Sequence, residues 1–320
     1  YMKNKLLSLA SVLAVFNVNA IEIGPTGSGV EMSGFIDLYY QSGDTDAVGV
    51  GQVEIDFDYS SGPISASVDF DLGGDFADPN NLEEAIITYD FGNGFSVTAG
   101  EMLTYLGFEA YDPINMYQYS SAYADSLAPY DSDTTVAGIQ PFPHIYDAFA
   151  TGASVDYVTD IFSVGIWTSI GESADFEYAL AYTGIDNLTI KAIIADYGTN
   201  STGPFDGKST YWASYQLGKL LLAGEVANAE AATAADPELD GTLVMANYAV
   251  TDSTAVTFRY SLTELEVGGT KQIDETKFTI SPSYVFNDNL SGLVEYSTFD
   301  QDGTLAETED YFAAELIYTF

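Results

Sequence analysis

The sequence contains no cysteine and very little positive charge. Of its 320 residues, 8 are Lys or Arg, 48 are Asp or Glu, and one is His. Without cysteine, the chain can form neither disulfides nor thiolate metal sites. A formal net charge of −40 disfavours contact with nucleic acid, so we expect no nucleic-acid partner. The hydrophobic content of 47% also excludes a disordered acidic chain.

The sequence also lacks a hydrophobic run of the length that a transmembrane helix needs, which is about 20 residues. The apolar stretch from Leu6 to Phe16 is too short for a span, but it follows Lys3 and Lys5 and precedes Val18-Asn19-Ala20, whose small residues are typical of a cleavage site. We therefore predict a secretory signal peptide over residues 1–20 and a mature chain over residues 21–320. An exported chain of this kind is either soluble or a β-barrel.

Two neighbouring segments, 52–59 and 64–71, alternate strictly between apolar and polar residues. The apolar face carries no charge, which is what a lipid-facing surface requires, because Lys or Arg at the bilayer midplane costs about 2–4 kcal/mol and acids somewhat less. A soluble sandwich would also alternate, with its polar side in water. If the segments belong to a barrel, the acids of the polar face line its lumen; they are Glu54, Asp56, Asp58, Asp69 and Asp71.

The same alternation recurs along the chain and predicts an all-β fold, a transmembrane antiparallel barrel of about sixteen strands, with a range of about 14 to 18. Short hairpin turns rich in Gly, Asn and Asp alternate with longer links, apart from the short link 171–173. Short turns on one rim and long loops on the other are typical of outer-membrane barrels. The longer links are predicted at 41–50, 72–82, 101–149, 198–208, 230–240, 264–274 and 299–309.

The end of the chain supports an outer-membrane location. Phe312, Leu316, Tyr318 and Phe320 fall on one face of the last predicted strand, and the final residue is aromatic. This ending resembles the C-terminal strand of bacterial outer-membrane proteins, which the barrel-assembly machinery recognises. The resemblance implies localisation in the bacterial outer membrane, with its lipid and that machinery as partners.

The link 101–149, between the fifth and sixth predicted strands, is much longer than ordinary connections. Acids in a narrow aqueous channel attract cations and repel anions, and this link contains no basic residue. Some of its acids can instead form turns or face outside water. Its tyrosines either pack the loop against the barrel wall, which we favour, or stack on sugar rings. The acids that we expect to line the pore or its constriction are Glu101, Glu109, Asp112, Asp125, Asp131 and Asp133.

Part of this link is similar to a known family. The segments Tyr105-Leu106-Gly107-Phe108-Glu109, Tyr111-Asp112-Pro113, Tyr117-Gln118-Tyr119-Ser120 and Leu127-Ala128-Pro129 resemble the OmpL-like β-barrel porin family. The resemblance to porins implies that residues 101–149 fold into the barrel and constrict the pore. Analogy with sixteen-stranded porins also implies a homotrimer. Family members more often have basic residues in this loop, so an inherited selectivity does not follow.

We looked for catalytic chemistry and expect none. The single His144 has no nucleophile motif beside it, and one His without Cys makes a zinc site improbable, so we predict no enzymatic activity, no cofactor and no metal. The leading hypothesis is a porin for passive diffusion of small hydrophilic solutes, with cations preferred. The alternatives are a structural or adhesive barrel with an occluded lumen and a soluble exported binding protein. The acidity could equally reflect adaptation to a saline habitat.

Overall fold

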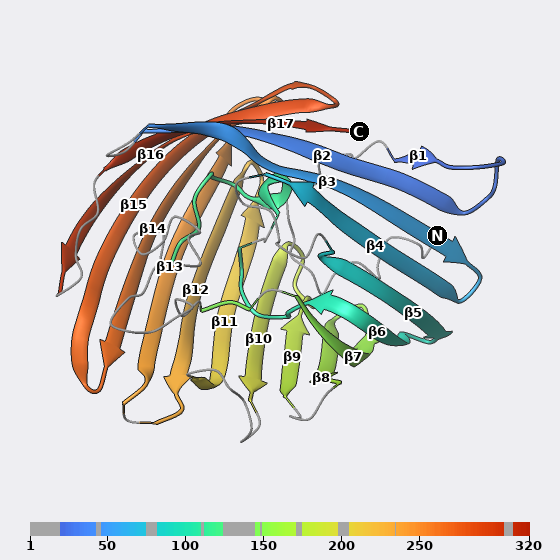
Figure 1. Cartoon of the computed structure of the whole chain (residues 1–320), viewed down its shortest axis with the longest axis horizontal. Coiled ribbons are helices and arrows are strands. Elements are labelled where there is room, and N and C mark those ends of the chain that lie inside the picture. Colours follow the sequence, from blue (N-terminus) through green and yellow to red (C-terminus); the bar gives the residue numbers. More distant parts are fainter. Residues whose placement is uncertain are drawn as a thin grey trace.

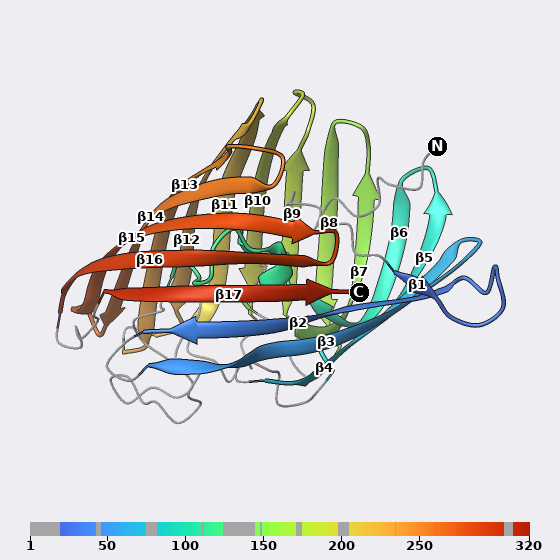
Figure 2. The same cartoon turned by 90° about the horizontal axis from the view of Figure 1, so that it is seen from above.

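The structure, a computed structural model, describes residues 20–42, 46–74, 82–109, 112–123, 145–147, 149–170, 175–197, 205–233, 235–303 and 310–320. Its strands form one antiparallel sheet (Figures 1 and 2). Strands β2 to β17 pair in sequence order, and β17 pairs with β2, which closes a barrel of sixteen strands. The two-residue strand β1 (Ile21–Glu22) pairs with β2 beside the barrel. The predicted fold class is therefore confirmed.

The barrel strands are β2 Val30–Gln41, β3 Ala47–Ser61, β4 Ile64–Gly73, β5 Glu84–Gly92, β6 Phe95–Leu103, β7 Phe149–Val158, β8 Phe162–Ser169, β9 Phe176–Tyr182, β10 Leu188–Asp196, β11 Phe205–Leu217, β12 Leu220–Ala231, β13 Pro237–Ala249, β14 Thr254–Val267, β15 Thr270–Asn287, β16 Leu290–Asp302 and β17 Tyr311–Thr319. A single-turn 3-10 helix, η1 (Pro113–Asn115), lies between β6 and β7. Among the described residues, no helix has the length and apolar character needed to cross a membrane.

Side chains alternate between the outside and the inside of the barrel wall. On β4, Ile64, Phe70 and Leu72 are exposed on the outside, whereas Asp69 and Asp71 point inward. The same alternation on the other strands leaves large apolar side chains exposed over the outer surface. In water such a surface would be unfavourable, but it fits the hydrocarbon core of a membrane.

Aromatic pairs lie at the rim that carries the short turns. Tyr89 packs edge-on against Phe91 near the end of β5, and Tyr284 packs in the same way against Phe286 near the end of β15, with ring centroids 4.8 and 4.9 Å apart. All four side chains are exposed on the outer surface. Their position is that of the aromatic girdle found at one interface of outer-membrane barrels.

One predicted loop is wrong. Instead of a long link over 264–274, β14 and β15 continue to a two-residue turn at Gly268 and Gly269, both with positive φ. The outward residues Glu264, Glu266 and Asp274 interrupt the apolar alternation there, which is why the sequence suggested a loop. Hydrogen bonding between the strands continues regardless, because charged side chains are tolerated where a strand extends beyond the lipid.

The segment between β6 and β7 is here called the long loop (residues 104–148), and its described parts are 104–109, 112–123 and 145–147. Both views show its described part within the ring of strands rather than outside it (Figures 1 and 2). Buried apolar residues form one cluster, which joins the long loop to the inner faces of β9 to β15. The core of this protein therefore lies on one side of the lumen.

Candidate functional site

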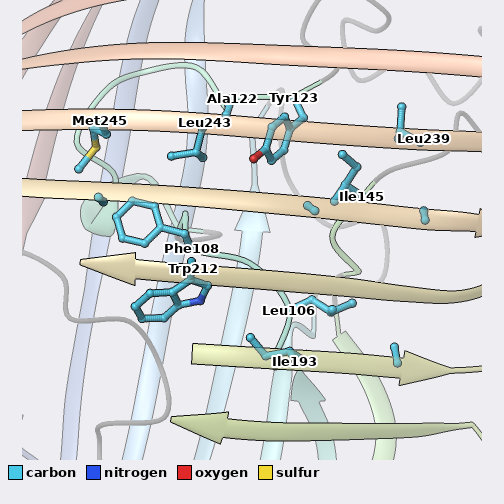
Figure 3. Close-up of a cluster of buried hydrophobic side chains, with 14 of the residues drawn as sticks. Leu106, Phe108, Ala122, Tyr123, Ile145, Ile193, Trp212, Leu239, Leu243 and Met245 are labelled. Carbon is cyan, nitrogen blue, oxygen red and sulfur yellow. The ribbon is translucent and has the colours of Figure 1, made fainter. Parts of the chain in front are cut away.

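The long loop covers one wall of the lumen through apolar packing (Figure 3). Phe108 meets the edge of Trp212 on β11, with ring centroids 5.5 Å apart. The inward faces of β12 and β13 are mostly apolar, whereas the lumen of a water-filled barrel is ordinarily polar. The cluster includes Leu106, Phe108, Ala122, Tyr123 and Ile145 of the loop and Ile193, Trp212, Leu239, Leu243 and Met245 of the wall.

The tyrosines of the loop take part in this packing. Tyr123 belongs to the cluster, and Tyr105, Tyr117 and Tyr146 pack against it. The hydroxyls of Tyr123 and Tyr146 both donate to Glu225, an inward residue of β12. Each ring thus covers apolar wall while its polar end finds a buried partner. For these four residues the packing interpretation is confirmed.

A buried ion pair fixes the centre of the loop. Arg259 on β14 contacts Glu109 through Nη1 and Oε1 at 2.5 Å, and the two side chains are 1% and 4% exposed. The same guanidinium donates to the carbonyl oxygens of Ser120 and Ser121 at 2.7 and 2.8 Å. Glu109 also accepts hydrogen bonds from the Gln118 side chain and the Ala122 backbone. One arginine thus joins two stretches of the loop to the wall.

Two neighbouring strands extend this anchorage. Lys277 on β15 donates to Ser120 Oγ at 2.7 Å and to the Ser121 carbonyl at 2.9 Å. Glu295 on β16 accepts from the backbone N–H and the hydroxyl of Ser120 at 3.1 and 2.5 Å. We call these contacts of Glu109, Ser120 and Ser121 with Arg259, Lys277 and Glu295 the loop anchor.

The first residues of the loop are held on other strands. Glu177 on β9 accepts from the Thr104 hydroxyl and the Tyr105 backbone at 2.7 and 2.8 Å. The Tyr105 hydroxyl donates to Asp156 on β7 at 2.7 Å. At the other described stretch of the loop, Asp147 forms an ion pair with Lys208 on β11 at 2.5 Å. Polar contacts therefore hold the loop from β7 round to β16.

The six Lys and Arg residues of the described part of the chain do not face the open lumen. Four of them, Lys191, Lys208, Arg259 and Lys277, point inward but are buried where the long loop lies over their strands. Of the other two, Lys271 is near the turn between β14 and β15 with Glu264 and Asp274, and Lys219 is at the turn before β12. The loop contains no basic residue, but Arg259 and Lys208 of the wall pair with two of its acids, Glu109 and Asp147.

The opposite wall is acidic. Glu54, Asp56 and Asp58 share the inward face of β3, and Asp69 and Asp71 share that of β4. Cross-strand pairing sets Glu54 directly opposite Asp71 and Asp56 opposite Asp69. Glu54 and Asp71 are buried, Asp56 and Asp69 are partly exposed, and Asp58 is exposed. We call these five residues the acidic wall.

The long loop meets the acidic wall at Asp112. Carboxylate oxygens of Asp112, Glu54 and Glu83 all lie within 4.8 Å of one another, so these residues could hold a cation. The Gln52 amide donates to Glu54 at 3.0 Å and to Glu83 at 3.3 Å. Burial and the charge of Glu83 raise the pKa of Asp112 to about 7. Here the loop adds negative charge to a wall that is already negative.

Two predicted constriction residues lie elsewhere. Glu101 is on the outer face of β6. It stands directly opposite Thr151 of β7, whose exposed side chain donates a hydrogen bond to it. The neighbouring pair, Gly100 and Gly152, faces inward. Glu109 is inside but bound to Arg259, so it does not offer a free negative charge. Glu101 was misplaced because strand β6 continues to Leu103, and Glu109 because its partner Arg259 comes from a distant strand. Asp125, Asp131, Asp133 and His144 lie outside the described residues.

Sequence reasoning missed the residues that hold the loop, above all Glu177, Glu225, Arg259, Lys277 and Glu295. Each occupies an inward position on a strand whose outward positions are mainly apolar. A charged residue at such a position was the available signal. Its partner could not be inferred, because the partners are far apart in sequence. The ion pair of Lys208 with Asp147 spans 61 residues, and the hydrogen bonds of Glu295 with Ser120 span 175.

The last residue closes the barrel. Phe320 and Gly34 on β2 exchange two backbone hydrogen bonds of 3.1 Å, which continue the pairing of β17 with β2. The Phe320 ring stacks near Tyr318 at a centroid distance of 6.3 Å and lies over Gly34. Phe312, Leu316 and Tyr318 are exposed on the outer face of β17.

Comparison with known proteins identifies the fold. No family model and no curated protein matches the chain, so the resemblance to the OmpL-like family is not confirmed. A loop-deletion variant of OmpT, an outer-membrane protein of Vibrio cholerae, matches with a TM-score of 0.67 and 17% identity, over 91% of this chain and 99% of that one. OmpF of Salmonella typhi, in complex with daunomycin, matches with a TM-score of 0.65 and 17% identity, over 94% of this chain and 100% of that one.

An anion-selective porin from Comamonas acidovorans also matches, with a TM-score of 0.62 and 13% identity over 91% of this chain and 99% of that one. The chain therefore has the sixteen-stranded fold of bacterial outer-membrane porins, and its apolar outer surface fits that location. Because a porin described as anion-selective shares this fold, the fold does not decide which ions pass. That question depends on the residues of this lumen.

Proposed function

We propose that this chain, exported by a signal peptide over residues 1–20, is an outer-membrane porin through which small hydrophilic solutes diffuse passively, with cations preferred. It has no enzymatic role in this proposal. The observation that carries it is the separation of charge across the lumen. Partly or fully exposed acids of the acidic wall lie on one side, and the inward basic residues are buried beneath the long loop on the other.

The charge that meets water in the lumen is negative. Asp56, Asp58 and Asp69 retain contact with water, and no inward basic residue of the mature chain does so to a comparable extent. Low-dielectric walls focus the field of such charges along a narrow aqueous path. Cations are therefore concentrated and anions repelled, as in channels lined by rings of acidic side chains.

Planar-bilayer recording of the purified protein tests both parts of the proposal. Discrete conductance steps are expected, with a reversal potential in a salt gradient that shows cation preference. Asp56→Asn, Asp58→Asn and Asp69→Asn combined should reduce that preference. A matched control neutralises three outward acids, Glu238→Gln, Asp240→Asn and Glu264→Gln, and should leave it unchanged. Anion selectivity of the unaltered protein would overturn the cation preference.

The alternative of a structural or adhesive barrel is favoured by one observation, namely the burial of inward side chains along β13 to β17. If the long loop closes the remaining lumen too, no conductance steps will appear. Equal effects of the inward and outward triple variants would instead favour a general adaptation of acidic surfaces to a saline habitat.

By analogy with its structural neighbours, one of which is an OmpT of Vibrio cholerae in trimer form, we extend the proposal to a homotrimer. Assembly by the barrel-assembly machinery belongs to the same proposal and is supported by the position of Phe320 at the closing pair of strands. Mass measurement of the detergent-solubilised protein tests the trimer.

A further inference from the structure

Two inward carboxylates meet at the pair of strands that closes the barrel. Asp37 lies on β2 and Glu315 on β17, and the register pairs Asp37 with Ile317 and Glu315 with Tyr39. The two acids are thus diagonal neighbours on one face of adjacent strands, which is within the reach of their side chains. Their charges repel each other, and Glu295 on β16 adds to the repulsion.

Both carboxylates are enclosed. Asp37 is 1% exposed and Glu315 is 6% exposed. On the inward face of β2, Asp37 is flanked by Phe35 and Tyr39, both buried, and Tyr39 stands directly opposite Glu315. Tyr39 stacks on Tyr119 of the long loop, with ring centroids 6.0 Å apart. The loop therefore helps to exclude water from the pair.

Each acid has one carboxylate oxygen that no group of the described residues satisfies. Asp37 Oδ1 and Glu315 Oε2 are buried without a hydrogen-bond partner in the described part of the chain. The basic residues of this wall, Lys277 and Arg259, lie on β15 and β14, beyond Glu295, and bind the long loop. A buried, unpaired carboxylate is strongly unfavourable, and two together are more so.

We propose that Asp37 and Glu315 bind a divalent cation of the calcium type, which holds the closing strands β2 and β17 together. Carboxylate oxygens are the ligands that such cations prefer, and the ion would keep part of its hydration shell within the enclosed site. One shared proton would leave a negative charge on the pair beside Glu295, whereas a divalent cation neutralises both acids. The site is separate from the acidic wall, and it does not depend on the proposed transport function.

The test measures barrel stability in detergent free of lipopolysaccharide, first in EDTA and then with added calcium chloride. The unaltered protein should lose its folded form at a temperature that rises by several degrees with calcium. Half of the rise should occur at about 10⁻⁴ to 10⁻³ M, the range of weak protein calcium sites. The double variant Asp37→Asn/Glu315→Gln should be at least as stable in EDTA and should show no rise.

A matched control is the outward pair Asp240 and Glu264, which stand directly opposite each other on β13 and β14. Asp240→Asn/Glu264→Gln removes the same charge and should leave the calcium response intact. Asp37→Asn alone should raise the half-effective concentration at least tenfold, which provides a reading if the double variant assembles poorly. Terbium emission excited through tyrosine should fall in either Asp37 variant, and calcium should displace it in the unaltered protein.

Three results would overturn the proposal. The unaltered protein could be insensitive to calcium and EDTA, or the inward double variant could keep the full response. A rise in stability on acidification in EDTA, with no response to calcium, would show that the pair shares a proton instead.

Discussion

Arg259 and Glu109 form an ion pair that is almost completely enclosed, although 150 residues separate them in sequence. Arg259 belongs to the barrel wall and Glu109 to the long loop, so this pair fixes the centre of the loop against β14. It also removes from the lumen an acid that would otherwise contribute to its field. Lys277, Glu295 and the apolar cluster hold the neighbouring parts of the loop.

Breaking this pair should destabilise the barrel strongly. Arg259→Met or Glu109→Gln alone leaves one buried partner without its counter-charge, and we expect a loss of about 3–5 kcal/mol in the free energy of unfolding. The double variant should lose clearly less than the sum of the two, because no charge remains unpaired. Urea unfolding of the protein in lipid vesicles gives all three values. Additive losses would mean that the two residues act independently.

Truncating a side chain of the apolar cluster should destabilise the protein more than truncating one on the lipid-facing surface. Phe108→Ala removes a ring packed against Trp212 and leaves a cavity, so a loss of about 3–5 kcal/mol is expected. Phe70→Ala on the outer face of β4 is the control, since lipid chains can fill the space. Unfolding in vesicles compares the two. Similar losses would show that the loop is not tightly packed on the wall.

Cation preference should weaken on acidification through about pH 7. Burial, with the charges of Glu83 and Asp56, raises the pKa of Asp112 to about 7 from an ordinary value of 3.8, so this residue loses its charge within a mild pH range. Because the folded protein favours the protonated form, stability should rise as the pH falls from about 7 toward 4. Reversal potentials and unfolding at pH 8 and pH 5 measure the two effects.

Asp112→Asn is the control for this pH dependence. It should have a flatter pH profile and should be more stable than the unaltered protein at pH 8, because the uncharged amide is already present. An unchanged profile would assign the titration to other acids of the lumen.

The closing pair of strands should be sensitive at Phe320 and Gly34. Deleting Phe320 removes two backbone hydrogen bonds, and a Cβ on Gly34 would lie 2.3 Å from the Glu54 carbonyl oxygen and 2.8 Å from the Phe320 ring. We expect both the deletion and Gly34→Val to lower the amount of folded barrel in the outer membrane. Conductance per assembled channel should change little. Heat-modifiable mobility in electrophoresis measures the folded fraction, and normal levels would contradict the prediction.

The barrel could be predicted from the sequence because alternation is a local property. Lipid imposes an apolar outward face on every strand, and Gly, Asn and Asp mark the turns, so all sixteen strands could be placed. Alternation did not predict the strands correctly where they extend beyond the lipid, as at Glu264 and Asp274. Strand pairing continues there without an apolar outward face. It also misplaced Glu101, because a boundary error of a few residues at the end of β6 changed an outward residue into a loop residue.

The lumen was less predictable because its contacts are not local. The acidic wall follows from alternation within β3 and β4, whereas the loop anchor joins side chains of β14, β15 and β16 to a loop that precedes β7. The absence of basic residues from the loop suggested an uncompensated negative constriction. Arg259 and Lys208 show that compensation came from elsewhere in the chain.

The apolar inner faces of β12 and β13 oppose movement of the long loop away from the wall. If the long loop swung away, these faces would meet water while the outer faces remained in lipid, and the protein would lose its hydrophobic core. Such an excursion amounts to partial unfolding and is therefore rare. If the proposed transport function holds, solutes would pass beside a loop that stays in place, and the size limit for them should change little with temperature or voltage.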